Sequence, residues 1–272
     1  SGALQGARRF GWMAAAGIAP GAVRLGLTIP VCLAGGGVTA MLAVFAASVV
    51  AGLAVAYIPV RRNLGGQPSL PLDLRPFNAF FWPVAAGQLL LYVFMNADLI
   101  LMSRMLDGAV FAAYGKASML ARTVLFLPMP IVLAMFPRAV VSSDLKTLLM
   151  PAGIALVLAT GLATGVSILP GLALTIMYGV EGEVIERLLR AYAWAAVPLA
   201  MTMVLAQYVW ARHAARSLLW LAPVAAGYGA ALWFGGRGDA FGIIGLLALG
   251  NAAALAVLLG ITWRLVRRER GA

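Results

Sequence analysis

Long apolar runs alternate with short polar connections along the whole chain. Eight of these runs reach the length of about 20 apolar residues that a helix needs to cross a bilayer. The runs lie near residues 11–33, 37–60, 79–103, 109–136, 148–170, 187–210, 216–234 and 240–264. The sixth is the least regular, because "YGVEGEVIERLLRAY" gives it a charged, amphipathic start. The pattern predicts an all-α, polytopic bundle of about eight transmembrane helices.

Composition favours the same class of protein. The 272 residues are 63% hydrophobic and 11% charged, whereas soluble domains are about half apolar and a quarter charged. The 31 glycines and 14 prolines are tolerated better in membrane helices than in soluble ones. The single cysteine, Cys32, excludes an intrachain disulfide. Because the chain opens on Ser1 rather than Met, and "SGALQGARRFGW" resembles a loop leading into a helix, we expect the natural protein to have a further N-terminal part.

Charged residues in the connections are distributed asymmetrically. Thirteen of the 20 Lys and Arg residues lie on one side, namely Arg8, Arg9, Arg61, Arg62, Arg75, Arg138, Lys146, Arg212, Arg216, Arg264, Arg267, Arg268 and Arg270. The other side has only Arg104, Arg187, Arg190 and Arg237, together with five of the nine acidic residues. Cytoplasmic loops concentrate Lys and Arg, so we expect both ends of the chain and the 61–78 linker to be cytoplasmic. Orientation therefore accounts for the formal charge of +11, and no nucleic-acid partner is expected.

The longest polar connection is "RRNLGGQPSLPLDLRP". Its Gly-Gly pair and its prolines are typical of a loop between domains. It divides the chain into residues 1–60 with two predicted spans, the linker 61–78, and residues 79–272 with six spans and a basic tail.

Four ionisable residues lie deep in the predicted spans, away from the span ends: Arg24, Asp98, Lys116 and Arg122. Each costs about 2.5–3.5 kcal/mol or more at the bilayer centre, so such residues are typical of functional sites or of buried ion pairs. No acid is evident at the depth of Arg122, which favours a binding role over snorkelling or bonding to backbone carbonyls. Arg24 is as well explained by anchoring the helix bundle. Two midplane arginines together indicate a cavity for an anionic group, because a guanidinium suits phosphate.

A short turn through Asp107-Gly108 joins the third and fourth runs, which predicts an antiparallel hairpin. In such a hairpin, residues whose numbers sum to about 214 lie at equal depth, so Asp98 lies level with Lys116. We expect these two residues to form a structural ion pair, since pairing is the usual solution for buried charges. The functional alternative is that Asp98 is protonated, or binds an ion, during transport.

Helical spacing separates the other polar residues of this hairpin from the expected pair. One stripe at i, i+4 and i+8 lies on each helix, and together with the arginine of the first span these stripes make up the predicted substrate cavity: Arg24, Gln88, Tyr92, Asn96, Tyr114, Ser118 and Arg122. Asp98 lies about 200° around the helix from Asn96. We therefore expect Asn96 to face the cavity and Asp98 to point away from it.

The sequence contains no P-loop, no HExxH motif, no metal-spaced His/Cys cluster and only one histidine. Catalysis of acyl, glycosyl or phosphoryl transfer usually needs clustered acids or bases near a water-accessible face. We therefore expect neither an enzyme nor a bound metal or cofactor.

The segment "NADLILMSRMLDGAVFAAYGKASMLARTVLFLPMPIVLAMFPR" resembles the oligosaccharide flippases, the Wzx-type polysaccharide biosynthesis proteins of the multidrug/oligosaccharidyl-lipid/polysaccharide transporter superfamily. The shared features are Asn96-Ala-Asp98 late in a span, Gly108 at the turn, Ala113-Tyr114 opening the next helix, and Phe136-Pro137-Arg138 closing it. The opening "ALQGARRFGW" also resembles the segment that enters the fifth helix in that family. The resemblance is specific at residues 94–138, and later spans match mainly by hydropathy.

The resemblance implies a fold of two six-helix lobes that alternate access around a central cavity. Residues 1–60 would then be the last two helices of the first lobe, 61–78 the inter-lobe linker, and 79–272 the whole second lobe. The implied substrate is an undecaprenyl-pyrophosphate-linked oligosaccharide, which is moved to the outer leaflet of the bacterial inner membrane for synthesis of O-antigen, capsule or exopolysaccharide. The implied partners are this substrate and membrane lipids, with a polysaccharide polymerase or other assembly proteins as further candidates.

Two other functions fit the sequence. One is a cation-coupled drug or metabolite exporter of the same superfamily, in which a membrane carboxylate would matter most. The other is a non-transporting membrane scaffold or assembly subunit, which would have no water-accessible central cavity.

Overall fold

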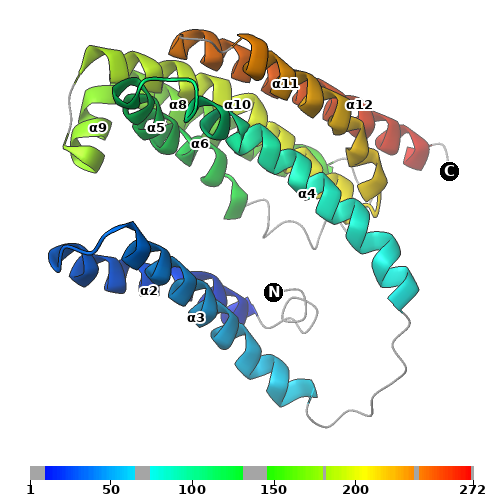
Figure 1. Cartoon of the computed structure of the whole chain (residues 1–272). Coiled ribbons are helices and arrows are strands. Elements are labelled where there is room, and N and C mark those ends of the chain that lie inside the picture. The colour runs from blue at the N-terminus through cyan, green and yellow to red at the C-terminus, as the bar shows by residue number, and fades with distance from the viewer. Residues whose placement is uncertain (1–9, 65–73, 131–145, 180–181, 236–238, 271–272) are drawn as a thin grey trace. The chain divides into compact units, whose positions relative to one another are not determined.

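A computed structural model describes residues 10–64, 74–130, 146–179, 182–235 and 239–270 (Figure 1). Every element in these ranges is helical, in agreement with the predicted all-α class. The chain forms two compact units, Ser1–Leu72 and Asp73–Ala272, each described by itself below. The division between them falls within the 61–78 linker.

The first unit is a helical hairpin of α2 (Phe10–Leu33) and α3 (Val38–Leu64). Gly35 lies in the turn between the two helices with φ of 71°, a left-handed conformation that favours glycine. The helices approach closely at Gly52, where an added Cβ would lie 2.5 Å from Cγ of Pro20.

The second unit is built around α10 (Glu183–Ala211), which packs against α5, α8 and α12 (Figure 1). Its remaining elements are α4 (Leu74–Met102), α5 (Gly108–Ala121), α6 (Thr123–Phe126), α8 (Lys146–Ile168), α9 (Pro170–Tyr178), the 3₁₀-helix η1 (Ala215–Trp220), α11 (Leu221–Gly235) and α12 (Ala240–Arg270). A helix enclosed on several sides has few side chains that face outward. In agreement, 72% of the residues in the apolar segment of α10 are buried, the largest share among the candidate membrane spans.

The charged start of the sixth predicted span is the first turn of α10. Glu183 and Glu186 lie in that turn, where the helix dipole favours negative charge. Arg187 pairs with Glu183, and Arg190 Nη2 lies 3.6 Å from Glu186 Oε2, both at i, i+4 spacing. The span predicted to be least regular therefore starts as a well-paired helix and becomes the centre of the unit.

Seven of the described helical segments are long and apolar enough to cross a membrane. The fourth predicted span, 109–136, is absent from this set, which is drawn from the described residues only. The helix stops at Ala121, and the short α6 follows after a break at Arg122. Residues 131–136 of this predicted span lie outside the described residues.

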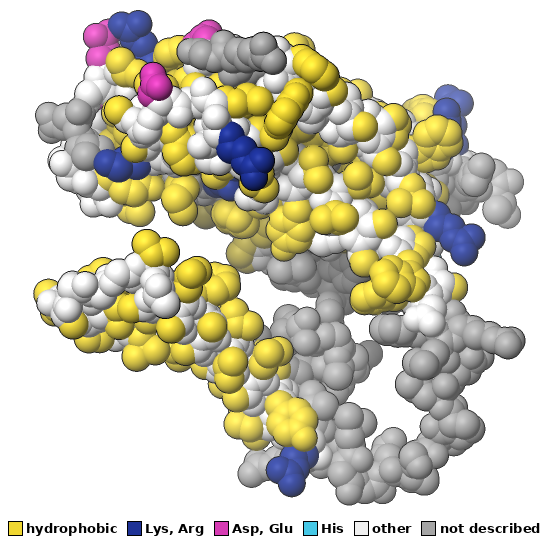
Figure 2. Space-filling view, viewed as in Figure 1, with side chains coloured by type: hydrophobic (Ala, Val, Ile, Leu, Met, Phe, Trp, Pro, Cys, Tyr) yellow, Lys and Arg dark blue, Asp and Glu magenta, His cyan; other side chains and the backbone are white. Residues whose placement is uncertain are grey.

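Apolar side chains are spread along the visible sides of the helices in each unit, as Figure 2 shows. Among the exposed residues, Leu25 and Leu249 are both 70% exposed and Leu33 is 85% exposed. Large contiguous apolar surfaces are rare on soluble proteins, and lipid is the solvent that accommodates them. The fold therefore defines a multi-pass α-helical membrane protein.

Candidate functional site

The regular α-helical hydrogen bonding changes at Arg122, whose backbone itself keeps a right-handed helical conformation (φ −65°, ψ −14°). The backbone N–H of Arg122 donates to the carbonyl of Ser118 at 3.0 Å. The Arg122 carbonyl is shared: it accepts from the N–H of Leu125, three residues on, at 2.9 Å and from the N–H of Phe126, four residues on, at 3.3 Å. The hydroxyl of Thr123 also donates to the carbonyl of Leu120, at 2.7 Å. Such a change from α-helical to tighter hydrogen bonding within a helix often marks a functional hinge.

Five polar side chains, four from α4, α5 and α10 and one from the residue between α5 and α6, meet here, and we call them the Asp98 cluster: Asn96, Asp98, Tyr114, Arg122 and Tyr192. Asp98 is fully buried, and its Oδ1 lies 3.3 Å from Nη2 of Arg122. Its Oδ2 accepts hydrogen bonds from the hydroxyls of Tyr192 at 2.6 Å and Tyr114 at 2.9 Å. Arg122 also donates from Nη1 to Oδ1 of Asn96 at 2.9 Å and from Nη2 to the Tyr192 hydroxyl at 3.5 Å. The cluster thus links α4, α5 and α10 through one carboxylate and one guanidinium.

The cluster contains one negative and one positive charge, so its formal charge is zero. A buried ion pair offsets its desolvation only when further hydrogen bonds satisfy the remaining oxygens and protons. The two tyrosine hydroxyls do this for Asp98, and hydrogen bonds of this kind to an ionised group are stronger than neutral ones. The carboxylate is therefore well matched to its surroundings.

Arg122 is less completely matched. A guanidinium carries five N–H donors, and Nε of Arg122 is buried without a hydrogen-bond partner among the described residues. The Arg122 side chain is also 12% exposed, whereas that of Asp98 is not exposed at all. The cluster therefore holds an arginine in a fixed orientation, with one buried N–H that no described residue satisfies.

The predicted Asp98–Lys116 pair was wrong, because the structure pairs Asp98 with Arg122. Helical side chains lean toward the helix N-terminus, so the long side chain of Arg122 reaches back along α5 toward the depth of Asp98. Lys116 lies off the helix face that carries Tyr114 and Arg122 and forms no ion pair with Asp98. Two expectations fall with this pairing. Arg122 has an acidic partner. Asn96 and Asp98 both bond to Arg122, although they were expected to point to different sides of their helix.

The other predicted cavity residues contribute differently. Tyr92 meets the cluster through its backbone, because Nδ2 of Asn96 donates to the Tyr92 carbonyl at 3.1 Å, while the Tyr92 side chain is 52% exposed. Gln88 shows no hydrogen bond to the cluster in the described part of the chain. Ser118 is buried, and its hydroxyl donates to the carbonyl of Gly115 at 2.9 Å. Their predicted role in lining a cavity stays a prediction.

Arg24 belongs to the first unit. It donates to the hydroxyl of Ser48 at 3.4 Å and lies 4.5 Å from the ring centroid of Phe45, a cation–π distance. These contacts fit the anchoring role that the sequence left open. A cavity shared by Arg24 and Arg122 stays a prediction.

Sequence reasoning missed Tyr192 as a site residue. The depths of two residues can be compared from sequence only when a short turn joins their helices. Tyr192 lies 94 positions after Asp98 along the chain, so this comparison could not place it near Asp98. The only available signal was a polar aromatic residue near the charged start of the sixth span.

Comparison with protein-family models, with curated proteins and with solved structures finds no match to this chain. Within the described ranges, no group of three or more His, Cys, Asp or Glu residues is placed to hold a metal ion. Fold and site together define a polytopic helical membrane protein with a largely buried ion-pair cluster beside the end of α5.

Proposed function

We propose that this chain acts in a lipid-linked oligosaccharide flippase of the bacterial inner membrane. In this proposal its two ends are cytoplasmic, residues 1–60 belong to one lobe and residues 79–272 form the other. The observation that carries the proposal is the state of Arg122, an oriented membrane arginine with a buried N–H that has no partner among the described residues. The substrate class comes from the resemblance of residues 94–138 to that family.

The chemistry of the cluster suits a pyrophosphate group. Arginine presents a rigid planar fork that matches phosphate oxygens. Asp98 and Asn96 each accept a hydrogen bond from a different Nη of Arg122, which fixes the plane of the guanidinium before a ligand arrives. In our proposal a phosphate oxygen bonds to the remaining N–H groups and competes with Asn96 for Nη1. Asp98 stays anchored by its two tyrosines.

The helix break supplies a site for movement. Discontinuous helices are common at the binding sites of alternating-access transporters, where they let one part of a lobe move against another. Arg122 occupies the break between α5 and α6, and its side chain bonds to α4 and α10. Occupation of the cluster by an anion would therefore change the bonds that hold α5 to its neighbours.

Substitution of Arg122 in the full-length protein tests the proposal. Arg122→Gln should lower surface polysaccharide at least about ten-fold, since a hydrogen bond to a charged group contributes roughly 1.5–3 kcal/mol. Arg122→Lys should restore only part of the output, because lysine keeps the charge and loses the fork. Lys116→Gln is the matched control, as it removes a cation from the same helix outside the cluster. Normal polysaccharide output from a well-expressed Arg122→Gln protein would refute the assignment.

A cation-coupled exporter is the second candidate, and the observation that favours it is the carboxylate itself. Asp98 is fully buried and bonded to two hydroxyls and one cation, a setting in which protonation would rearrange several hydrogen bonds at once. Transport measurements in vesicles separate the two functions. An exporter would take up an organic cation in response to an imposed pH or sodium gradient and would lose this response in Asp98→Asn. A flippase would instead move a labelled prenyl-pyrophosphate-linked oligosaccharide.

A further inference from the structure

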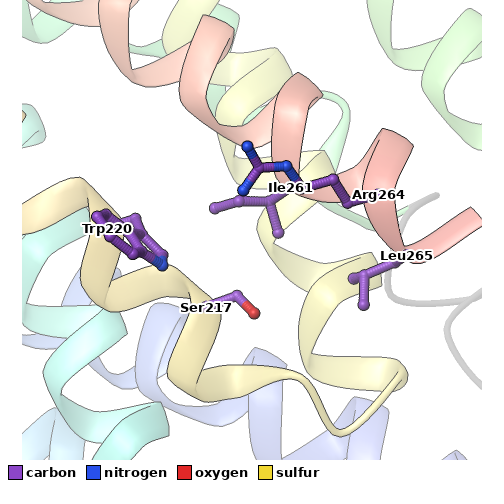
Figure 3. Close-up of a pocket in the computed structure, with 5 residues that line it drawn as sticks. All are labelled: Ser217, Trp220, Ile261, Arg264 and Leu265. Carbon is purple, nitrogen blue, oxygen red and sulfur yellow. The ribbon is translucent and has the colours of Figure 1, made fainter. Parts of the chain in front are cut away.

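A second polar site lies where the end of α12 packs beside η1. A small pocket of about 150 Å³ is lined there by Ser217, Trp220, Ile261, Arg264 and Leu265 (Figure 3). Ser217 and Trp220 come from η1, and the other three residues come from α12. None of them belongs to the Asp98 cluster.

The polar groups of this pocket are all suited to donate hydrogen bonds. Figure 3 shows the guanidinium of Arg264 extending from α12 into the space between the helices, which the hydroxyl of Ser217 and the indole of Trp220 border from η1. In the described part of the chain, none of these three side chains has a hydrogen-bond or ion-pair partner. Three donors, with no acid among the five lining residues, make the pocket suited to an anion with several acceptor oxygens, such as a phosphate group.

An apolar groove continues from this pocket. A cavity of about 450 Å³ shares Trp220, Ile261 and Arg264 with the pocket and runs on between α11 and α12. Its further walls are Pro223, Val224, Ala256, Val257 and Gly260. A Cβ added at Gly260 would meet no atom within 4 Å, so the groove is open above this glycine. A ligand that fills both cavities needs an anionic head and an apolar chain.

We propose that this composite cavity binds an anionic phospholipid of the surrounding membrane. The phosphate lies among Ser217, Trp220 and Arg264, and one acyl chain runs along the groove past Gly260. Two observations favour this occupant over free phosphate or a protein segment: the headgroup pocket opens into an apolar groove, and Trp220 is 68% exposed, as is common for tryptophan at a membrane–water interface. On the topology predicted from charge, the site faces the cytoplasmic leaflet, where basic pockets between helices recognise anionic headgroups. The proposal does not depend on what the protein transports.

Native mass spectrometry of the full-length protein in a neutral detergent tests the site. Dioleoylphosphatidylglycerol is titrated in parallel with dioleoylphosphatidylcholine, dioleoylglycerol and inorganic phosphate. The phosphatidylglycerol should bind with the highest affinity, and Arg264→Gln should weaken it about ten-fold, the effect of losing one hydrogen bond to a charged group. Equal affinity for the diacylglycerol, or equally effective binding of inorganic phosphate alone, would overturn the proposal.

Three variants make the test specific. Gly260→Leu introduces a side chain into the open groove without changing the charge, and it should also weaken phosphatidylglycerol binding several-fold. Trp220→Phe keeps an aromatic ring, loses the N–H donor and should have a smaller effect in the same direction. Arg267→Gln is the control: it removes an equal charge three residues further along α12, where the guanidinium lies 4.8 Å from the centroid of the Trp263 ring. An equal loss of affinity in Arg264→Gln and Arg267→Gln would show general electrostatic attraction to the basic tail and exclude the built site.

Discussion

The Asp98–Arg122 pair makes a quantitative prediction that separates the observed site from the one expected from the sequence. The perturbation is a double-mutant cycle of Asp98→Asn, Arg122→Gln and the double variant, all made in the full-length protein. A second cycle replaces Arg122→Gln with Lys116→Gln. The two cycles differ only in the cation that is removed.

The magnitude follows from what each variant leaves behind. Arg122→Gln leaves the fully buried carboxylate of Asp98 with its two tyrosine hydroxyls and no cation. Removal of one partner of a buried pair costs about 3–5 kcal/mol. We expect the lower end, about 3 kcal/mol, because these hydroxyls still bond to the carboxylate. Asp98→Asn should cost about 2–3 kcal/mol, since Arg122 keeps Asn96 and is partly exposed.

The double variant removes both charges, so it should cost little more than either single change. The coupling free energy between Asp98 and Arg122 is therefore expected to be about 2–3 kcal/mol, within the range seen for residues in direct contact. The cycle with Lys116 should be additive within about 0.5 kcal/mol. Reversible unfolding in mixed detergent micelles, followed by tryptophan fluorescence and circular dichroism, measures each free energy of unfolding.

Two outcomes would refute this reasoning. Additive effects of Asp98→Asn and Arg122→Gln would show that the pair contributes no specific interaction in the folded protein. A coupling free energy of 2–3 kcal/mol with Lys116 instead would restore the pair predicted from equal depth in the hairpin. In either case the cluster would lose its arginine anchor, and the binding role proposed for Arg122 would fall with it.

Two further predictions concern packing and topology. An added Cβ at Gly250 would lie 2.6 Å from Cδ2 of Tyr228, so Gly250→Ala should lower the free energy of unfolding by about 1–3 kcal/mol. Gly245 lies on the same helix, and a Cβ added there would have no atom within 4 Å. Gly245→Ala should therefore raise the free energy of unfolding by about 0.5–1 kcal/mol. The opposite order of stability would contradict the observed contact between α11 and α12. In a variant whose native cysteine is replaced by serine, cysteines introduced at Arg187 and Arg216 should label from opposite sides of the membrane. An impermeant thiol reagent added to intact cells should reach Arg187→Cys at once and Arg216→Cys only after permeabilisation, and the reverse would overturn the orientation read from charge.

The sequence predicted the number and approximate limits of most membrane helices, because the hydrophobic length of a run is a local property of the chain. The start of α10 shows how far this reasoning extends. Glu183 and Arg187 interrupt the apolar pattern, but they lie four residues apart and form an ion pair in the first turns of α10. Pairs at this spacing stabilise a helix, so the sequence contained the information needed to predict a helical start here. The break at Arg122 was harder to predict, because "MLARTVLF" contains neither glycine nor proline to mark it.

The sequence predicted most of the residues of the candidate site but not which of them contact one another. Four of the five cluster residues, Asn96, Asp98, Tyr114 and Arg122, were singled out because polar groups are costly in an apolar helix. The predicted contacts among them were wrong, because the comparison of depths in the hairpin places each side chain at the level of its own backbone. An arginine side chain spans more than a helical turn and leans toward the helix N-terminus, so its charge lies away from its Cα.

The sequence by itself determined which residues must be buried in a membrane and which of them carry charge, since both follow from the free energy of transfer of each side chain into lipid. Only the tertiary structure decided which charges meet. That choice depends on the angular position of each helix face, on the break after Ala121 and on α10, which brings Tyr192 to Asp98 across 94 positions of sequence. Contacts between distant segments are set by the packing of whole helices, and no local pattern in the chain encodes them.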